Sequence, residues 1–243
     1  MVATAMQLGD DGRVDTYVWK TPEDLLGPLD EVERKHAPEQ LWIAGDASLL
    51  THGARVSIVG SRKASELGLR RAAKLAHLLV QRGVTVVSGL AEGIDAAAHT
   101  QAILSGGRTV AVLGTPLDKT FPAMHRDLQA EIIRSHLAVS QFAPGSSTTR
   151  ASFPMRNRTM ALVSDATVII EAGAKSGTIH QGWEALRLGR ALYILESLAR
   201  CGFEWVDKLR DHGAHVLSDG NREEFMDSLP EESRIERFAQ SPF

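Results

Sequence analysis

The sequence has very little cysteine: Cys201 is the single thiol among 243 residues. One thiol cannot form an intramolecular disulfide or a multi-thiolate metal site, so we expect a reducing compartment and treat Cys201 as an ordinary small side chain. The chain has no apolar run of membrane-spanning length, and its amino terminus has neither the basic nor the apolar region of an export signal. We therefore predict a cytoplasmic protein that does not interact with a membrane.

The chain also lacks an excess of positive charge. Its 27 Lys and Arg residues stand against 30 Asp and Glu residues, which gives a formal net charge of -3 at pH 7. The whole molecule therefore has no general attraction for nucleic acid, and such binding would need a local concentration of basic side chains. The length and the 43% of apolar residues fit one large or two small domains with a buried core. A disulfide-stapled miniprotein and a disordered tail are excluded.

Signatures of several enzyme classes are missing. The chain contains no G-x-G-x-x-G and no G-x-x-x-x-G-K-[ST] sequence, the usual fingerprints of dinucleotide-dependent oxidoreductases and P-loop phosphotransferases. A nucleophile elbow and an H-E-x-x-H motif are absent too. Asp95 and His99 would share a helix face, but no third ligand stands at metal-binding spacing, so a helix-dipole role for Asp95 and a buried contact for His99 are the simpler interpretation. We expect no enzymatic activity, no cofactor and no metal.

Short β-branched runs alternate with amphipathic stretches, a pattern typical of a parallel sheet covered by helices on both faces. The predicted strands are residues 41–44, 56–59, 84–87, 109–113, 137–140, 167–170 and 191–195. The predicted helices between them are residues 69–80, 94–104, 124–135 and 177–188. The sequence therefore predicts an α/β fold with three layers and a mostly parallel sheet.

The two ends of the chain have weaker patterns. Residues 1–20 are predicted to form a loose arm, followed by a helix that begins after Thr21 with Pro22 in its first turn. Residues 205–209, 214–217 and 223–229 suggest a helix, a short strand and a helix. We divide the chain into an N-terminal arm and helix (1–40), a core (41–220) and a C-terminal helix and tail (221–243).

Three glycine-containing turns follow predicted strands, and their carboxyl ends should meet at one edge of a parallel sheet, where the ligands of such folds bind. A single turn of this kind is usually only turn geometry, but basic and hydroxyl side chains in all three favour an anionic ligand. The turn residues that we single out are Gly60, Ser61, Arg62, Lys63, Ser88, Gly89, Lys175, Ser176, Gly177 and Thr178.

A basic-aromatic stretch follows the longest predicted loop, residues 142–152. Residues 150–158 carry three arginines, one phenylalanine and no acid. Arginines can pair with successive phosphates, and an aromatic ring can stack on an unpaired base, which is worth about 1–3 kcal/mol. Alternatively the ring anchors the loop to the core and the arginines are solvated or paired with acids. The candidate binding residues of this stretch are Arg150, Phe153, Arg156, Asn157 and Arg158.

Five segments, 56–65, 87–99, 109–114, 153–158 and 176–178, together resemble the DprA (Smf) DNA-processing family in sequence, order and spacing. The similarity runs from about residue 41 to 195 and more faintly to 217. The resemblance implies an extended Rossmann-like core that binds single-stranded DNA without strong sequence preference. It further implies a homodimer and, in transformable bacteria, protection of incoming strands during natural transformation and their transfer to the recombinase RecA.

By position, the resemblance implies that Arg62 contacts a phosphate, that Gly60, Ser88 and Gly89 bring backbone amides near the strand, and that Lys175 to Thr178 belong to the same interface. It also implies that Arg150 is the basic residue ahead of the Phe-Pro motif, that Phe153 stacks on a base, and that Arg156, Asn157 and Arg158 line the pocket. The chain departs from the family at His180, Gln181 and Trp183, where the family usually has a threonine- or alanine-rich helix start.

Two other functions stay open. Ser176 to Thr178 with Glu184 looks somewhat like the G-G-x-G-T-x-x-E site of proteins that sense nucleotides or cleave nucleoside monophosphates, although Glu184 lies later in the helix than that motif requires. A self-associating scaffold is the third hypothesis, with Trp205, Val206 and Leu209 as its apolar patch. Core packing is the commoner explanation of such spacing.

Overall fold

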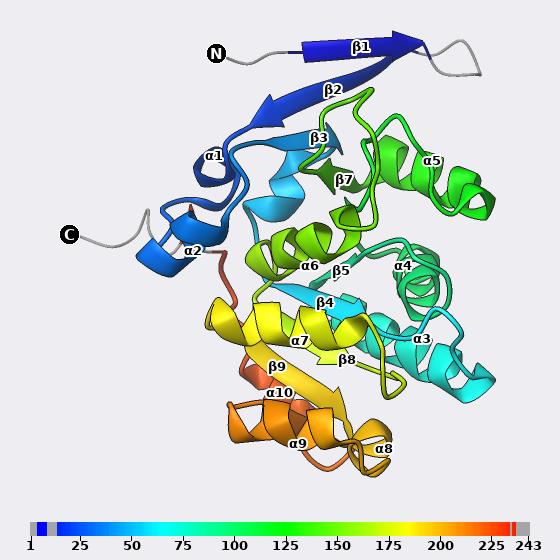
Figure 1. Cartoon of the computed structure of the whole chain (residues 1–243), viewed down its shortest axis with the longest axis vertical. Coiled ribbons are helices and arrows are strands. Elements are labelled where there is room, and N and C mark those ends of the chain that lie inside the picture. Colours follow the sequence, from blue (N-terminus) through cyan, green and yellow to red (C-terminus); the bar gives the residue numbers. More distant parts are fainter. Residues whose placement is uncertain (1–3, 9–13, 234, 237–243) are drawn as a thin grey trace.

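The computed structural model describes residues 4–8, 14–233 and 235–236, whose ten strands form one sheet (Figure 1). The strand order is β1-β2-β3-β7-β6-β5-β4-β8-β9-β10. All neighbours from β7 to β10 are parallel, whereas β1, β2 and β3 add on antiparallel at one edge. The strands are β1 Thr4–Leu8, β2 Val14–Lys20, β3 Leu41–Gly45, β4 Arg55–Val59, β5 Thr85–Ser88, β6 Thr109–Leu113, β7 Leu137–Ser140, β8 Ala166–Ile169, β9 Ala191–Leu195 and β10 His215–Leu217.

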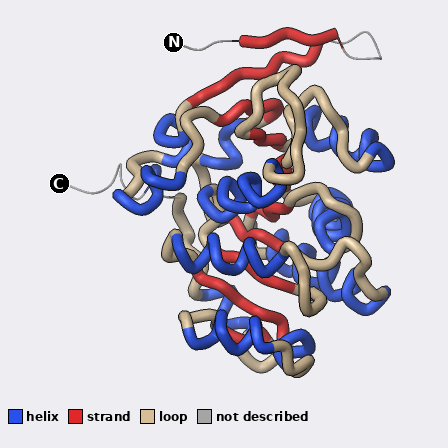
Figure 2. Tube along the Cα trace, viewed as in Figure 1, coloured by secondary structure: helices blue, strands red, loops and turns tan. Residues whose placement is uncertain are grey.

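Helices cover both faces of this sheet, which gives the three layers seen in Figure 2. One face packs against α1, α6, α7 and α9, and the other against α3, α4, α5 and α10. The α-helices are α1 Pro22–Leu26, α2 Glu31–His36, α3 Glu66–Gln81, α4 Ile94–Leu104, α5 Arg126–Ser135, α6 Ser152–Leu162, α7 Thr178–Arg187, α8 Glu196–Ala199, α9 Glu204–Asp211 and α10 Arg222–Asp227. Two short 3-10 helices are Ala47–Leu50 and Ala123–His125. Across the described residues, no helix is long and apolar enough to span a bilayer.

The local sequence explains where α3 begins and ends. The Ser65 hydroxyl accepts a hydrogen bond from the Gly68 amide at 3.0 Å, which caps the first turn. Ala72, Ala76 and Leu79 recur at helical spacing and are buried against the sheet. The helix therefore runs from the end of β4 across one face and returns the chain to β5.

The predicted strands of the core and the helices between them are confirmed, including the alternation of residues 204–227 after β9. Strands β4, β5, β6, β7 and β8 are buried along their whole length, as expected for strands covered on both faces. The division of the chain at residues 40 and 220 stays a prediction.

The prediction of a loose N-terminal arm was wrong, whereas the predicted helix start after Thr21, with Pro22 in its first turn, is confirmed. In the described part of residues 1–20, the chain forms β1 and β2, and β2 pairs with β3. The helix predicted after Thr21 is broken into α1 and α2, because Gly27 has a φ of +79° and Pro28 follows it. Each of the two short helices has its own capping box, at Thr21 and at Asp30.

Candidate nucleic-acid interface

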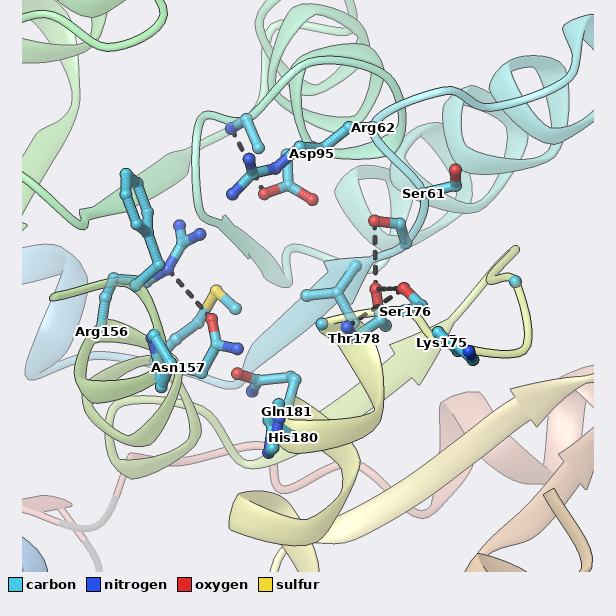
Figure 3. A pocket seen from close by; sticks show the side chains of 18 of the residues that line it. Ser61, Arg62, Asp95, Arg156, Asn157, Lys175, Ser176, Thr178, His180 and Gln181 are labelled. Carbon is cyan, nitrogen blue, oxygen red and sulfur yellow. Dashed lines mark hydrogen bonds between the residues drawn. The ribbon is translucent and has the colours of Figure 1, made fainter. Parts of the chain in front are cut away.

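A pocket of about 670 Å³ lies beyond the carboxyl ends of β4 and β8 (Figure 3). We call it the strand-end pocket. Four segments form it: the turns after β4, β5 and β8, and the start of α6. The turn after β8 leads directly into α7, and the first residues of α7 also line the pocket. Its lining residues are Val59, Gly60, Ser61, Arg62, Lys63, Ala91, Asp95, Phe153, Pro154, Arg156, Asn157, Met160, Gly173, Lys175, Ser176, Gly177, Thr178, His180 and Gln181.

The structure brings together most of the residues that the sequence singled out. Gly60 to Lys63, Phe153, Arg156, Asn157 and Lys175 to Thr178 all line the strand-end pocket. Parallel strands cause this convergence, because the ends of β4, β5 and β8 point to the same edge of the sheet. Ser88, Gly89, Arg150 and Arg158 are not among the lining residues.

Hydrogen bonds hold the turn after β4 against the turn after β8. The Ser61 amide donates to the carbonyl of Glu171 at 2.7 Å, and the Thr178 hydroxyl donates to the carbonyl of Gly60 at 3.2 Å. The Ser176 hydroxyl in turn donates to the Thr178 hydroxyl at 2.9 Å. The backbone of the two turns is therefore fixed before any ligand arrives.

Three cations surround the opening of the pocket. Arg62, Lys63 and Lys175 are exposed, and none of them has a carboxylate within ion-pair distance among the residues that the structure describes. The nearby Glu171 carboxylate instead accepts hydrogen bonds from the amide and the hydroxyl of Ser65. The opening is therefore locally positive on a molecule of net negative charge.

The Phe153 ring lies beside this cationic opening and is only half-buried. The Arg62 guanidinium carbon is 5.3 Å from the centre of the ring, within cation–π distance. Gly114, which follows β6, makes room for the ring: a Cβ atom there would lie 2.6 Å from Phe153 Cδ1. The ring is therefore held in place with part of its surface open to a ligand.

Sequence analysis missed a second ring at this place. Phe121, in the loop after β6, is 52% exposed, and its ring centre is 5.5 Å from that of Phe153. The sequence did contain a signal for this ring, because Phe121 is an aromatic residue in the loop after a predicted parallel strand. Such loops converge on the edge of the sheet where ligands bind.

Arg156 forms part of the pocket floor and is only 6% exposed. Its Nη1 donates to the carbonyl of Val112 at 3.0 Å, and burial lowers the pKa of its guanidinium while the charge of Asp95 opposes that shift. The guanidinium fits there because Gly89 has no side chain: a Cβ atom at Gly89 would lie 1.5 Å from Arg156 Nη1. Arg156 therefore supplies buried positive charge rather than the freely reaching side chain that the sequence suggested.

Asp95 is the buried acid next to this arginine, and it lies on the first turn of α4. Its carboxylate accepts hydrogen bonds from the amides of Gly89 and Ala91 at 3.2 and 3.4 Å. Burial raises the pKa of Asp95, and the Arg156 charge and these amides oppose the shift. Figure 3 shows Asp95 at the edge of the pocket, where it braces the turn after β5.

The expected role of Ser88 and Gly89 does not fit their positions. Ser88 is fully buried as the last residue of β5, and its hydroxyl donates to the carbonyl of Ile58 at 2.6 Å. The Gly89 amide is used by Asp95. The Ser88 hydroxyl and the Gly89 amide therefore bond to other groups of the protein. The reason is that β5 ends one residue later than predicted, at Ser88.

Arg158 and Arg150 also differ from expectation. Arg158 forms an ion pair with Glu184 of α7 at 3.1 Å, so it ties α6 to α7. Because α6 begins at Ser152, Arg156 and Arg158 are helical and lie about 200° apart around its axis. Arg150 is exposed just before the helix and outside the lining residues.

The residues considered for other functions have structural roles. Glu184 is paired with Arg158 and Arg187 and does not line the pocket, so it is not placed to assist cleavage of a bound nucleotide. The Nδ1 atom of fully buried His99 is 2.7 Å from the Thr109 hydroxyl.

The apolar patch proposed for self-association is part of the core. Trp205, Val206 and Leu209 are buried on α9 and pack in the same hydrophobic cluster as α6 and α7. They offer no surface to a second chain, and the commoner explanation of their spacing is the right one.

The model of a protein family described as DNA recombination-mediator protein A matches residues 22–228. The DNA processing protein DprA of Streptococcus pneumoniae is 34% identical over 215 residues, which cover 87% of this chain and 73% of that protein. Protein Smf of Synechocystis sp. is 41% identical over 191 residues, which cover 76% of this chain and 44% of that protein. The chain thus spans most of the first relative and less than half of the second.

Solved structures show the same fold. The X-ray structure of the Streptococcus pneumoniae protein matches with a TM-score of 0.70 and 30% identity, over 83% of this chain and 72% of that chain. DNA processing protein A from Helicobacter pylori matches with a TM-score of 0.70 and 23% identity, over 93% and 94% of the two chains. The predicted α/β Rossmann-like fold with a mostly parallel sheet is confirmed.

Proposed function

The chain belongs to the DNA recombination-mediator protein A family, and we propose that it binds single-stranded DNA in the strand-end pocket. The observation that carries this proposal is the group of three cations, Arg62, Lys63 and Lys175, that have no ion-pair partner among the described residues and lie around one pocket with the half-buried ring of Phe153. A phosphate chain with exposed bases is the ligand that needs both features. Binding of this kind needs no catalytic group.

The arrangement favours a single strand over a duplex. The cations stand at the opening and can pair with successive phosphates, while the Phe153 ring can stack on a base only if that base has left its partner. In a duplex the base faces are covered by their neighbours, so only the phosphate contacts would remain. Single-stranded DNA binding is described for the Helicobacter pylori protein, whose fold this chain shares.

The biological role follows from the family and goes further than the site. We propose that the chain works in the cytoplasm as a homodimer, protects single strands during natural transformation or another recombination process, and passes them to RecA. The family's description as a recombination mediator supports this role. Light scattering at several protein concentrations tests the dimer, and strand exchange by RecA with and without the protein tests the transfer.

A competition experiment tests the binding proposal. A labelled single-stranded oligonucleotide is bound to the protein and challenged with unlabelled single strand or with duplex of the same sequence. We expect the single strand to compete at a concentration at least about fivefold lower, since it keeps the stacking contacts worth about 1–3 kcal/mol per base. Equal competition by duplex would show that the ring takes no part and would refute the proposal.

A further inference from the structure

One polar side chain in the wall of the strand-end pocket is buried without a partner. Gln181, on the first turn of α7, is 1% exposed. Neither its Nε2 nor its Oε1 has a hydrogen-bond partner within the described part of the chain. A buried amide that lacks both partners destabilises the folded state, whereas an apolar side chain of the same size would not. A packing role therefore does not account for a glutamine here.

The position of Gln181 separates it from the other buried polar atoms without partners. Of the described residues that have such atoms, Gln181 alone lines the strand-end pocket. Gln129 is a useful contrast, because its Nε2 donates to the carbonyl of Leu117 at 3.0 Å and only its oxygen is left over. Both polar atoms of the Gln181 amide lack a partner among the described residues, and Gln181 lines the strand-end pocket.

Asn157 places a second amide at the same wall. Figure 3 shows the Gln181 side chain pointing toward Asn157, and both residues line the pocket. The Asn157 Oδ1 accepts a hydrogen bond from Arg156 Nε at 3.1 Å, which fixes the flip of this amide and directs its Nδ2 donor away from the arginine. The wall therefore holds the Gln181 acceptor and donor, both buried, next to a further donor from Asn157.

We propose that Gln181 reads the edge of one nucleobase of the bound strand when that base enters the strand-end pocket. A carboxamide can form two hydrogen bonds with a base edge that has a donor next to an acceptor, as adenine has at N6 and N7. Bases of single strands are available for such contacts on their Watson–Crick and Hoogsteen edges. The bound base would give the orphaned amide the partners that the protein does not supply. This inference rests on the proposed function.

In this proposal, the residues at the opening of the pocket and Gln181 in its wall have separate functions. The exposed cations and the Phe153 ring contact any strand, because phosphates and ring faces are the same for every sequence. Gln181 adds a contact whose strength depends on which base is present. The chain should therefore bind all single strands but discriminate among them.

Homopolymer binding by the full chain tests the inference. Dissociation constants are measured by fluorescence anisotropy for dA, dC and dT oligonucleotides of one length and for a strand of abasic units, with wild type, Gln181→Leu and Gln101→Leu. Leucine keeps the approximate volume and removes both polar atoms. Gln101 lies on α4 outside the pocket and donates to Ser105, so it is the matched control.

We expect the wild type to prefer one homopolymer by about fivefold or more, the lower end of the effect of a bidentate base contact. Gln181→Leu should reduce that ratio toward one and leave the affinity for the abasic strand unchanged, while Gln101→Leu should change neither. Gln181→Leu should also raise the Tm of the free protein, because it removes the orphaned amide. If it instead unfolds, Gln181→Met is measured in its place.

Three results would overturn the inference. If the homopolymer ratio is the same in wild type and Gln181→Leu, strand binding stands but Gln181 does not read a base. If free mononucleotides bind with the same dependence on Gln181 while oligonucleotides show no discrimination, the pocket takes a free nucleotide instead. If no strand binds in a salt-sensitive manner, the proposed function fails and the inference with it.

Discussion

At the scale of single residues, the site gathers three exposed cations, Arg62, Lys63 and Lys175, that have no carboxylate partner among the described residues. Several surface arginines, such as Arg70 with Glu66 and Arg200 with Glu196, have an acidic partner four residues earlier in the chain. Such exposed pairs contribute little to stability and leave no free charge for a ligand. Within the described residues Arg62 has no such neighbour, so its charge is available to a phosphate.

Replacing Arg62 with alanine should lower the affinity for every single strand to a similar degree, because a phosphate contact carries no sequence information. The slope of log K against log salt should also become shallower by about 0.7, the value for one phosphate contact on a single strand. Anisotropy titrations at several salt concentrations measure both quantities. Arg200→Ala, which removes an arginine already paired with Glu196, is the control and should leave the slope unchanged.

Replacing Phe153 with alanine should weaken strand binding by about 1–3 kcal/mol, because one stacking contact is lost. Stacking releases no counterions, so the loss should be the same at low and high salt. Phe153→Tyr keeps the ring and should bind nearly as well as wild type. A loss that disappears at high salt, or an equal loss in the tyrosine variant, would show that the ring does not stack on the strand.

His99 should make the fold sensitive to acid. Burial lowers its pKa from 6.5 to about 3, so between these values the unfolded chain takes up a proton that the folded chain does not. The free energy of unfolding should therefore fall as the pH drops below 6.5, with a limiting slope of about 1.4 kcal/mol per pH unit from this residue. Chemical denaturation between pH 7 and pH 4 should show a flatter pH dependence for His99→Gln than for wild type.

Other groups with shifted pKa values stay in both proteins, among them His136 and Asp95. Burial also lowers the pKa of His136, which acts in the same direction, and raises the pKa of Asp95, which acts in the opposite direction. The difference between variant and wild type therefore isolates His99. His77→Gln, at an exposed position on α3, is the matched control. An unchanged pH profile for His99→Gln would contradict the burial of a neutral imidazole.

At the scale of elements, the sequence correctly predicted the strands and helices whose formation depends on a local pattern of apolar residues. Strands β4 to β8 are short runs of mostly apolar and β-branched residues, and α3 has the apolar spacing of a helix that packs on one face. Helix α6 was missed because its buried residues include Ser152, Arg156 and Thr159, which give no apolar stripe. Arg156 and Thr159 bond to Val112 and Gln141, which lie more than ten residues away, and periodicity carries no information on such partners.

The fit between α6 and the sheet depends on Gly89. A side chain at Gly89 would collide with the Arg156 guanidinium, so Gly89→Ala should lower the free energy of unfolding by about 1–3 kcal/mol, the usual cost of overpacking. It should also weaken strand binding by displacing the floor of the pocket. Chemical denaturation and anisotropy measure the two effects. Gly220→Ala, where the nearest atom would be an ordinary 3.6 Å away, should change neither.

At the scale of the whole molecule, the net charge of -3 would repel a polyanion, yet at one edge of the sheet the structure gathers cations that have no ion-pair partner in the described part of the chain. Sequence analysis predicted this gathering from the parallel direction of the strands. It could not predict which basic residues remain free, because the pairing of Arg158 with Glu184 and the burial of Arg156 depend on how α6 packs against α7 and β6.

The most direct measurement of the central claim is a salt titration of oligo-dT binding by wild type and by the triple variant Arg62→Ala, Lys63→Ala, Lys175→Ala. We expect wild type to bind at micromolar concentration or below and to lose affinity steeply as salt rises, with a slope that the variant reduces by about 2. The same slope in both proteins, or no salt-sensitive binding by wild type, would contradict the claim that these cations hold the strand.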